Sequence, residues 1–409
     1  MEHVASDRSI DSQLDGYVAK LISSGAIRSA AVETAFRRVP RHRLIEGFYP
    51  GKYGDDDLVV VDPDDPAPEH INAVYGEGAL VTRVKDGLPA SSSSAPGLVA
   101  SMLELLELKP GMRVLEIGGG TGYNAALLSE MVGDQRWVVS VEYQEDVVAQ
   151  TRRLLAQAGY GEIAVIQGDG FFPPYQEAAP FDRVVATVGC PDISPHWLAE
   201  LSPQGFALVP LRQLLMNPLV RVWKEGDEVQ GRVVGLSGFM MMEGELHDSA
   251  YWPKGGPPMD TEAAREDRVW ADFNGPPQSG EAWEASEWGG FWYFLATRER
   301  RAWMPHWRGF GLWDEGRGTV LVTEATIRTV GDVGLRAELD HLYDDWQSLG
   351  RPRPSQYRLA FLPMASVSRD VHPGAWNVDR RFFRQLTWVE DAHGHRLEAS
   401  YSPQRRDGQ

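Results

Sequence analysis

The feature that most constrains the fold is a glycine-rich segment at residues 111–133, which reads GMRVLEIGGGTGYNAALLSEMVG. Its apolar run at 114–117 predicts a buried strand, and residues 125–131 have the spacing of a helix. The turn between them, 118–122, contains four glycines, so its backbone is able to approach a ligand closely. A strand, a glycine turn and a helix in this order are typical of the start of a nucleotide-binding unit.

The following residues continue the alternation of a parallel α/β sheet. Residues 137–141, WVVSV, predict a second strand that ends at Glu142, and residues 145–158 predict a helix. Further strands are predicted at 163–167 and 181–189. Ligands bind at the carboxyl ends of such strands, so an acid about 20 residues after the glycines is placed to accept both hydroxyls of a ribose.

The spacing of the glycines distinguishes between two kinds of cofactor. A dinucleotide site has the pattern G-x-G-x-x-G, with the pyrophosphate at the helix N-terminus. Here the pattern is G-x-G-x-G, and Glu116 precedes it. A carboxylate at this place repels phosphate and suits an ammonium group, such as the one on S-adenosylmethionine. The segment therefore predicts a site for S-adenosylmethionine and methyl transfer as the chemistry.

Four consecutive serines precede this segment, in the sequence SSSSAPGLVASMLELL at residues 91–106. Serine-rich runs are usually solvated linkers, but this one continues directly into an apolar periodicity that predicts a helix. Hydroxyls at a helix N-terminus are placed to bind an anion, which the helix dipole also favours. We expect positioning donors here. The alternative for Ser94 is a helix cap, and residues 91–93 are interpreted first as an ordinary loop, with a functional role as the alternative.

Charge and cysteine content exclude several classes of function. The formal net charge is -18 and the pI is about 5.0. This disfavours a nucleic-acid partner and suits a basic peptide. The single cysteine, Cys190, excludes a disulfide framework and a cysteine-cluster metal site, and is expected to be a buried or pocket-wall thiol. The sequence shows no signal-peptide core and no window near the roughly 18 apolar residues of a membrane span, so a soluble cytoplasmic protein without a metal is expected.

The N-terminal part of the chain predicts helices and an acidic loop. Residues 12–39 have the spacing of two short amphipathic helices with a break at Gly25. Residues 55–66, DDDLVVVDPDDP, place six aspartates around a short apolar run. A solvated loop beside a short strand is the first interpretation, and an acidic lip that attracts a cationic substrate is the alternative. Nothing fixes these carboxylates in the geometry of a metal site.

Taken together, these segments resemble the protein-L-isoaspartate O-methyltransferase family. The resemblance rests on SSSSAPGLVASMLELL, RVLEIGGGTGYNAALL, SVE, GDG, FDRVVATVGCPDISPHWLAEL and SPQGFALVPL, in that order, over about residues 14–211. It implies an α/β, Rossmann-like, S-adenosylmethionine-dependent methyltransferase domain with a helical N-terminal cap. The acceptor is then a side-chain carboxylate in a peptide. A carboxylate of pKa about 4 is ionised at neutral pH, so the reaction needs alignment and no general base.

The resemblance also implies roles for individual residues. Ser94, with Ser93 beside it, would hydrogen-bond the acceptor carboxylate as the catalytic pair. Glu142 would hold the ribose, and Asp169 the adenine amine. The cofactor residues implied are Glu116, Gly118, Gly120, Gly122, Tyr123, Asn124, Glu142, Tyr143, Asp169 and Gly170. The apolar stretch at residues 97–99 departs from the histidine-containing pattern of many members, which leaves the substrate preference open.

The resemblance ends near Leu211, yet 12 of the 14 tryptophans follow, which indicates a folded core in the second half. Strands are predicted at 219–223, 233–240, 292–296, 318–323 and 357–362, and a helix at 335–349. We therefore expect three parts: a helical cap with an acidic loop at 1–78, the methyltransferase domain at 79–214, and an α+β domain at 215–409 that helps to recognise substrate.

Two substrates and one non-enzymatic function compete at this point. The C-terminal extension and the altered residues 97–99 favour L-aspartate in a ribosomally made, net basic peptide, whose ester would then form a succinimide (aspartimide). The alternative is repair of L-isoaspartate in damaged proteins. A function of another class is a catalytically idle module that binds a peptide by its acidic face. The argument against it is that the predicted site residues are intact, namely Ser94, Glu116, Glu142 and Asp169. The expected partner is thus a peptide or protein, not nucleic acid or membrane.

Overall fold

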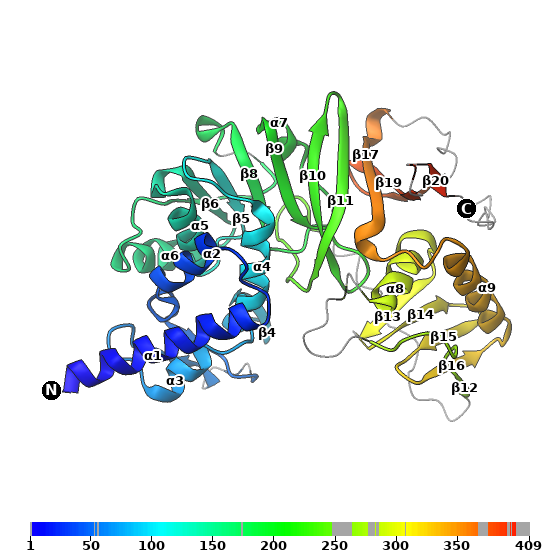
Figure 1. Ribbon diagram of the computed structural model, residues 1–409, viewed down its shortest axis with the longest axis horizontal. Coiled ribbons are helices and arrows are strands. Elements are labelled where there is room, and N and C mark those ends of the chain that lie inside the picture. Colours follow the sequence, from blue (N-terminus) through cyan, green and yellow to red (C-terminus); the bar gives the residue numbers. More distant parts are fainter. Residues whose placement is uncertain are drawn as a thin grey trace. The chain divides into compact units, whose positions relative to one another are not determined.

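The computed structural model describes residues 2–52, 54, 57–172, 175–247, 264–276, 283, 286–306, 308–366, 375–390, 393 and 395–397 (Figure 1). The chain forms two compact units. The first consists of Met1–Val188, Ser194–Leu208 and Met240–Glu245, and the second of Gly189–Ile193, Val209–Phe239 and Leu246–Gln409. The sequence placed borders at residues 79 and 215. In the structure, residues 1–78 share a unit with the glycine-rich segment, and residues 240–245 belong to that unit as well.

A parallel sheet is the framework of the first unit. Its strands are β5 (Val114–Ile117), β6 (Val138–Glu142), β7 (Ala164–Gln167), β8 (Phe181–Ala186) and β9 (Leu201–Pro210). Strand β5 pairs with β6 and β8, β6 with β7, and β8 with β9, all in parallel. The residues of β5 and β6 are all buried, as their apolar sequences require. The predicted sheet is confirmed, and its strand order reverses beside β5.

The helices of this sheet begin where the sequence supplies a start signal. They are α4 (Pro96–Leu106), α5 (Tyr123–Val132), α6 (Glu145–Gln157) and α7 (Pro195–Ala199), with short 3-10 turns η3 (Gln135–Trp137) and η4 (Gln176–Ala178). Proline occupies the first turn of α4 and α7, where its missing N–H is not needed. Helices α5 and α6 pack against β6 and so cover the sheet that carries the glycine turn.

The two predicted N-terminal helices are confirmed. The elements before the serines are α1 (Glu2–Ser23), α2 (Ala30–Arg38), η1 (Arg41–Leu44), β1 (Gly47–Phe48), β2 (Val59–Val60) and α3 (Pro68–Val74). Helix α2 packs on α1 and α5. Within the acidic stretch, β2 is a two-residue strand paired with β1, and no group of three potential metal ligands occurs among the described residues. The acidic lip stays a hypothesis.

A hairpin carries the serines, and the loop predicted for residues 91–93 is wrong. Strands β3 (Leu80–Lys85) and β4 (Leu88–Ser93) pair antiparallel. Asp86 and Gly87 join them, and both have positive φ. A two-residue turn of this kind matches the twist of the strands, and Asp-Gly is a preferred sequence for it. The Asp-Gly pair is thus the signal by which the sequence specified this hairpin.

The second unit is α+β, as predicted. One group of antiparallel strands contains β10 (Asn217–Glu225), β11 (Glu228–Ser237), β17 (Tyr357–Pro363), β18 (Trp376–Asp379), β19 (Phe383–Glu390) and β20 (Arg396–Leu397). A second sheet contains β12 (Arg265–Arg268), β13 (Ala302–His306), β14 (Gly309–Asp314), β15 (Gly318–Val322) and β16 (Thr326–Gly331). The helical segments are α8 (Glu287–Arg298), α9 (Gly334–Ser348), η7 (Pro354–Gln356) and η8 (Met364–Ser366).

The strand predicted at residues 292–296 is wrong, because these residues lie in α8. The hydroxyl of Ser286 accepts a hydrogen bond from Gly289 N and caps the helix. All residues from Trp288 to Thr297 are buried, so this helix has no polar face to reveal its period. A short apolar run does not by itself distinguish a buried strand from a buried helix.

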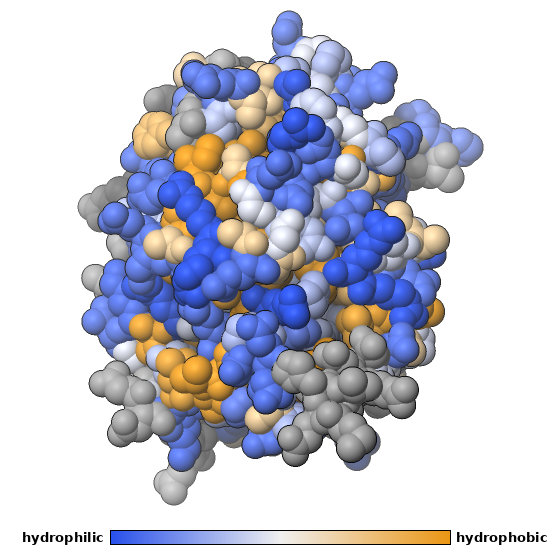
Figure 2. Space-filling view, turned by 90° about the vertical axis from the view of Figure 1, so that its left-hand side faces the viewer, coloured by the Kyte–Doolittle hydropathy of each residue, from blue (hydrophilic) through white to orange (hydrophobic). Residues whose placement is uncertain are grey.

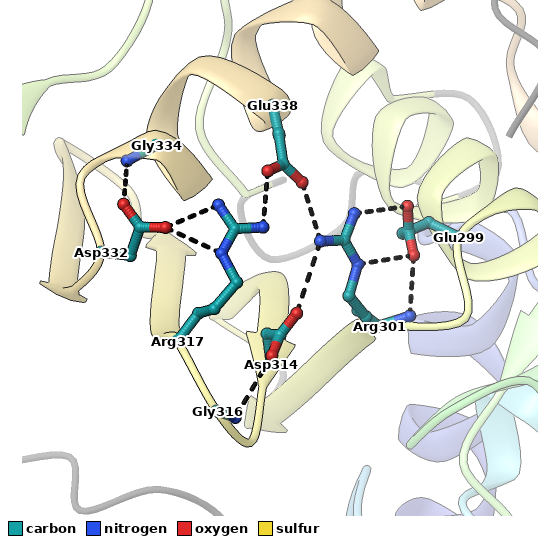
Figure 3. Close-up of polar contacts among 8 residues, drawn as sticks. All are labelled: Glu299, Arg301, Asp314, Gly316, Arg317, Asp332, Gly334 and Glu338. Carbon is teal, nitrogen blue, oxygen red and sulfur yellow. Dashed lines mark hydrogen bonds and ion pairs between the residues drawn. The ribbon is translucent and has the colours of Figure 1, made fainter. Parts of the chain in front are cut away.

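A network of ion pairs connects α9 to the sheet of β13–β16 (Figure 3). Glu338 on α9 accepts from Arg301 at 2.7 Å with one oxygen and from Arg317 at 2.6 Å with the other. Arg301 also pairs with Glu299, and Arg317 with Asp332. Burial alone would raise the pKa of Glu338, but the hydrogen bonds from the two arginines outweigh it and lower that pKa. Glu338 thereby links α9 to Arg301, which precedes β13, and to Arg317, which lies between β14 and β15.

The surface is mostly hydrophilic, with separate apolar areas on the face in Figure 2. The exposed large apolar residues among those described are Ile22, Leu58, Val60, Leu88, Tyr143, Phe172, Val333 and Met364. None of the helices in the described part of the chain is both long and apolar enough to cross a membrane.

Candidate functional site

The glycine turn after β5 tolerates no side chain at its key positions. Gly118, Gly120 and Gly122 have φ of +95°, +51° and +81°. A Cβ on Gly118 would lie 2.8 Å from Val188 Cγ1, and one on Gly122 would lie 2.9 Å from Thr151 Cγ2. Glycine is therefore required both for the conformation and for the space. The result is a tight loop at the carboxyl end of β5 whose glycines carry no side chain between the backbone and a ligand, as the sequence predicted.

Glu142 ends β6 and closes one side of this turn. One carboxylate oxygen accepts from Gly120 N at 3.0 Å, and the other accepts from Gln144 N at 3.0 Å. The side chain is 8% exposed. The structure thus brings the predicted ribose residue into direct contact with the glycine turn.

Glu116 is the least accessible of the predicted cofactor residues. It is 0% exposed, and its carboxyl group lies 2.5 Å from Ser140 Oγ and 2.8 Å from Asn124 Nδ2. Burial raises the pKa of Glu116 to about 7, although the hydrogen bonds from Ser140 and Asn124 act in the opposite direction. In this structure Glu116 fixes the half-buried Asn124, so its contact with an ammonium group stays a prediction. The sequence did not indicate that Ser140 contacts Glu116.

Asp169 lies just after β7, and two backbone amides orient its carboxylate. Oδ1 accepts from Phe171 N at 2.9 Å, and Oδ2 accepts from Glu245 N at 2.7 Å. A Cβ on Gly244, whose φ is +90°, would lie 2.4 Å from Asp169 Oδ2. This contact is not predictable from a local sequence pattern, because 75 residues separate Gly244 from Asp169.

The serine strand lies against the glycine turn. A Cβ on Gly120 would be 3.5 Å from Ser92 O and 3.9 Å from Ser91 Oγ. Helix α4 has Ala95 as its N-cap without a side-chain cap bond, so the cap alternative for Ser94 is not what the structure shows. Ser94 is half-buried, and within the described part of the chain its hydroxyl makes no hydrogen bond. It is free to bind a ligand.

One residue that the sequence interpretation missed holds this serine element. Arg41 in η1 is completely buried and donates hydrogen bonds to Ser93 Oγ and to the carbonyl oxygens of Ser93 and Ser94. A buried arginine has no signature in a single sequence, because arginine is usually exposed.

For three other predicted cofactor residues, Tyr123, Tyr143 and Gly170, the structure shows surroundings that do not indicate a cofactor role. Tyr123 is 3% exposed and packs on Tyr17, Phe36 and Arg41, so its side chain belongs to the core of the N-terminal helices. Tyr143 is 45% exposed. A Cβ on Gly170 would lie 2.5 Å from Ile117 Cγ2. Cofactor roles for these residues stay predictions.

Cys190 is fully buried, as expected, and burial raises the pKa of its thiol. This disfavours the reactive thiolate.

The sheet order, the glycine turn and the acid at the end of β6 define a Rossmann-like domain with a nucleoside-type cofactor site. The model of the family described as Protein-L-isoaspartate(D-aspartate) O-methyltransferase (PCMT) matches residues 13–243, more than half of the chain. The chain therefore belongs to this family of protein carboxyl O-methyltransferases.

Individual relatives agree with this assignment. Protein-L-isoaspartate O-methyltransferase of Thermotoga maritima is 34% identical over 180 residues, which are 44% of this chain and 50% of the relative. Protein-L-isoaspartate O-methyltransferase 2 of Archaeoglobus fulgidus is 33% identical over 53% of this chain and 87% of the relative. The Pyrococcus horikoshii enzyme is 36% identical over 51% and 83%. The chain thus spans half the length of the first relative and more than four fifths of the other two.

A solved protein-L-isoaspartate O-methyltransferase has the same fold over a longer region. It matches with a TM-score of 0.50 and 24% identity, and covers 85% of this chain and 96% of its own. Residues 13–243 alone do not account for 85% of the chain, so the likeness in fold includes part of the C-terminal extension.

Proposed function

We propose that this protein methylates the free carboxylate of an L-isoaspartyl residue in a protein or peptide, with S-adenosylmethionine as the methyl donor. The observation that carries the proposal is the free, half-buried Ser94 hydroxyl, which follows a serine strand whose residues Ser91 and Ser92 lie against the glycine turn, in a chain of this family. An isoaspartyl residue offers a carboxylate that is ionised at neutral pH, so the site needs no general base.

The residues present fit the donor that the family uses. The backbone of the glycine turn, Gly118–Gly122, would bind its methionine end, Glu142 would accept from its ribose, and Asp169 from its adenine amine. When bound, S-adenosylmethionine supplies a methyl group on a positively charged sulfur. The chain's own contribution is alignment: Ser94 would donate a hydrogen bond to the acceptor carboxylate and hold one of its oxygens in line. Alignment of this kind is worth up to about 7–11 kcal/mol.

Two observations favour isoaspartate over the dedicated aspartyl peptide expected from the sequence. The relatives that match over most of their length are protein-L-isoaspartate O-methyltransferases. The expectation of a dedicated peptide rests on the C-terminal extension and on residues 97–99. A solved protein with the isoaspartyl name shares fold beyond residue 243, so an extension does not by itself distinguish the two substrates.

A competition between matched peptides tests the proposal. Peptides of one sequence with L-isoaspartate, L-aspartate or D-aspartate at the same site are incubated with the full chain, and each ester is identified by the mass of one added CH2. We expect transfer to L-isoaspartate in several unrelated sequences. The Ser94→Ala variant should lose about 10²–10³-fold in turnover while it still binds S-adenosylhomocysteine.

Each other result has a definite meaning. Preference for L-aspartate in one basic sequence would restore the peptide-tailoring function, and loss of methanol from the ester, as the next backbone nitrogen closes a succinimide, would then be sought. Binding of peptide without any methyl transfer would indicate the idle module. Wild-type turnover by Ser94→Ala would remove Ser94 from the acceptor site.

A further inference from the structure

Arg41 is a buried cation whose hydrogen-bond partners are all neutral. Its side chain is 0% exposed. Nη1 donates to Val74 O at 2.8 Å, and the guanidinium carbon lies 5.6 Å from the centre of the Tyr123 ring. Among the described residues no carboxylate oxygen lies within 4.0 Å of its nitrogens. Burying a charge without a counter-ion is costly, so this arrangement calls for an explanation other than stability.

The remaining hydrogen bonds of Arg41 go to two residues. Nε donates to Ser93 Oγ at 3.2 Å, and Nη2 donates to Ser93 Oγ at 3.1 Å and to Ser93 O at 3.2 Å. Nη2 also donates to Ser94 O at 2.9 Å. Four of its five hydrogen bonds thus fix the turn between β4 and α4. Since this turn carries the free Ser94 hydroxyl, Arg41 fixes the backbone that presents it.

We infer that Arg41 is the positioning residue of the acceptor site, and that its buried charge makes the site prefer an anionic acceptor to the corresponding amide. The inference rests on the proposed function, because that proposal places the acceptor carboxylate at Ser94. The carboxylate of the substrate then supplies the negative charge that Arg41 lacks within the protein. Arg41 acts in two ways. Its hydrogen bonds order the carbonyls of residues 93 and 94, and its uncompensated positive charge beside them favours an anion.

The shape of the guanidinium is essential to this role. Its planar fork donates in several fixed directions at once, and a lysine ammonium on a flexible stem does not reproduce them. Arg41→Lys therefore keeps the charge and loses the turn geometry, whereas Arg41→Gln loses both the charge and the fork. Arg43 supplies the matched control. It lies in the same 3-10 turn, its side chain is 48% exposed, and its Nη2 is 4.0 Å from Asp64 Oδ1.

The first measurement is methyl transfer to the isoaspartyl peptide by the full chain. We expect Arg41→Lys to lower kcat/KM about 10²-fold, comparable to removal of one positioning donor, while the affinity for S-adenosylhomocysteine stays that of the wild type. Arg43→Lys should behave as the wild type. The double variant Arg41→Lys with Ser94→Ala should lose no more than Ser94→Ala alone, because two residues that act through one another are not additive.

The second measurement concerns charge selectivity. An isoaspartyl peptide and the same peptide with isoasparagine are compared as competitive inhibitors of the unmodified chain and of Arg41→Gln. The wild type should prefer the carboxylate, and Arg41→Gln should lose most of that preference. A structural defect would weaken both inhibitors equally and leave their ratio unchanged.

Several results would overturn the inference. Additive losses in the double variant, or an inhibitor ratio that Arg41→Gln does not change, would make Arg41 a structural residue only. If the Arg41 variants do not bind S-adenosylhomocysteine, the Ser93→Ala variant is measured instead, because it removes the hydroxyl that accepts from Nε and Nη2 of Arg41. Turnover of Ser93→Ala equal to that of the wild type would reject the positioning role of Arg41. If the wild type methylates only the aspartyl peptide, the isoaspartyl proposal fails, and the same double-variant cycle is measured on that peptide.

Discussion

At the scale of single residues, Glu116 shows how the core changes the chemistry of one side chain. Its carboxyl group is fully buried between Ser140 and Asn124, and burial raises its pKa to about 7 from an ordinary value of 4.5. The folded state therefore binds a proton more tightly than the unfolded state. This group contributes stability that is fully present below pH 4.5 and is lost as the pH rises through 7.

Replacement by glutamine should remove this dependence on pH. Glu116→Gln keeps the shape and mimics the protonated form. At pH 8 the ligand-free variant should be more stable than the wild type by up to about 3 kcal/mol, and near pH 5 the difference should be small. Urea unfolding of both proteins at the two pH values measures it, and titration of other groups cancels in the difference. An equal difference at pH 5 and pH 8 would show that Glu116 is ionised throughout.

At the scale of elements, the segment at residues 240–245 completes the first unit from the second half of the chain. One of its contributions is a backbone amide, Glu245 N, which donates to Asp169 Oδ2. The positive φ of Gly244 brings that amide into place, and there is no room for a Cβ beside the carboxylate. The orientation of the predicted adenine residue thus depends on a distant glycine.

Gly244→Ala should therefore weaken cofactor binding. The added methyl group would collide with Asp169, and the backbone conformation would be strained, so we expect about a tenfold or greater loss of affinity for S-adenosylhomocysteine, or about 1.4 kcal/mol. Gly238→Ala is the control, because a Cβ there meets nothing within 4 Å. Calorimetry measures the affinity of both variants for S-adenosylhomocysteine and for its inosine analogue, which lacks the amine. A loss of the same size for the two ligands would mean that Asp169 does not read the amine.

At the scale of the whole molecule, the net charge of -18 predicts how substrates approach. A negatively charged protein attracts cationic peptides over distances that salt screens. Between about 50 mM and about 500 mM salt, kcat/KM should fall more for a basic isoaspartyl peptide than for a neutral one of the same length. Initial rates at low substrate measure this. Parallel salt curves for the two peptides would show that the charge is too far from the acceptor site to steer them.

The sequence by itself determined the elements whose signals are local. The strands of the parallel sheet, the glycine turn and the position of Glu142 at the end of a strand follow from periodicity and spacing within about 30 residues, and the structure confirms them. The positive φ of the glycines in this turn was also predictable, because glycine adopts that conformation without the steric cost of a Cβ. The Asp86-Gly87 pair specified a hairpin as well, although the serines after it were read as a loop.

Only the tertiary structure decided the contacts between distant segments. Arg41 on Ser93 and Ser94, Ser140 on Glu116, and the amide of Glu245 on Asp169 join residues 24 to 76 positions apart. The same holds for the helix at 287–298, whose uniform burial removed the period that would have identified it. The physical reason is common to all of these. Local patterns report which face of an element is apolar, whereas the partner of a buried polar group depends on how the whole chain packs.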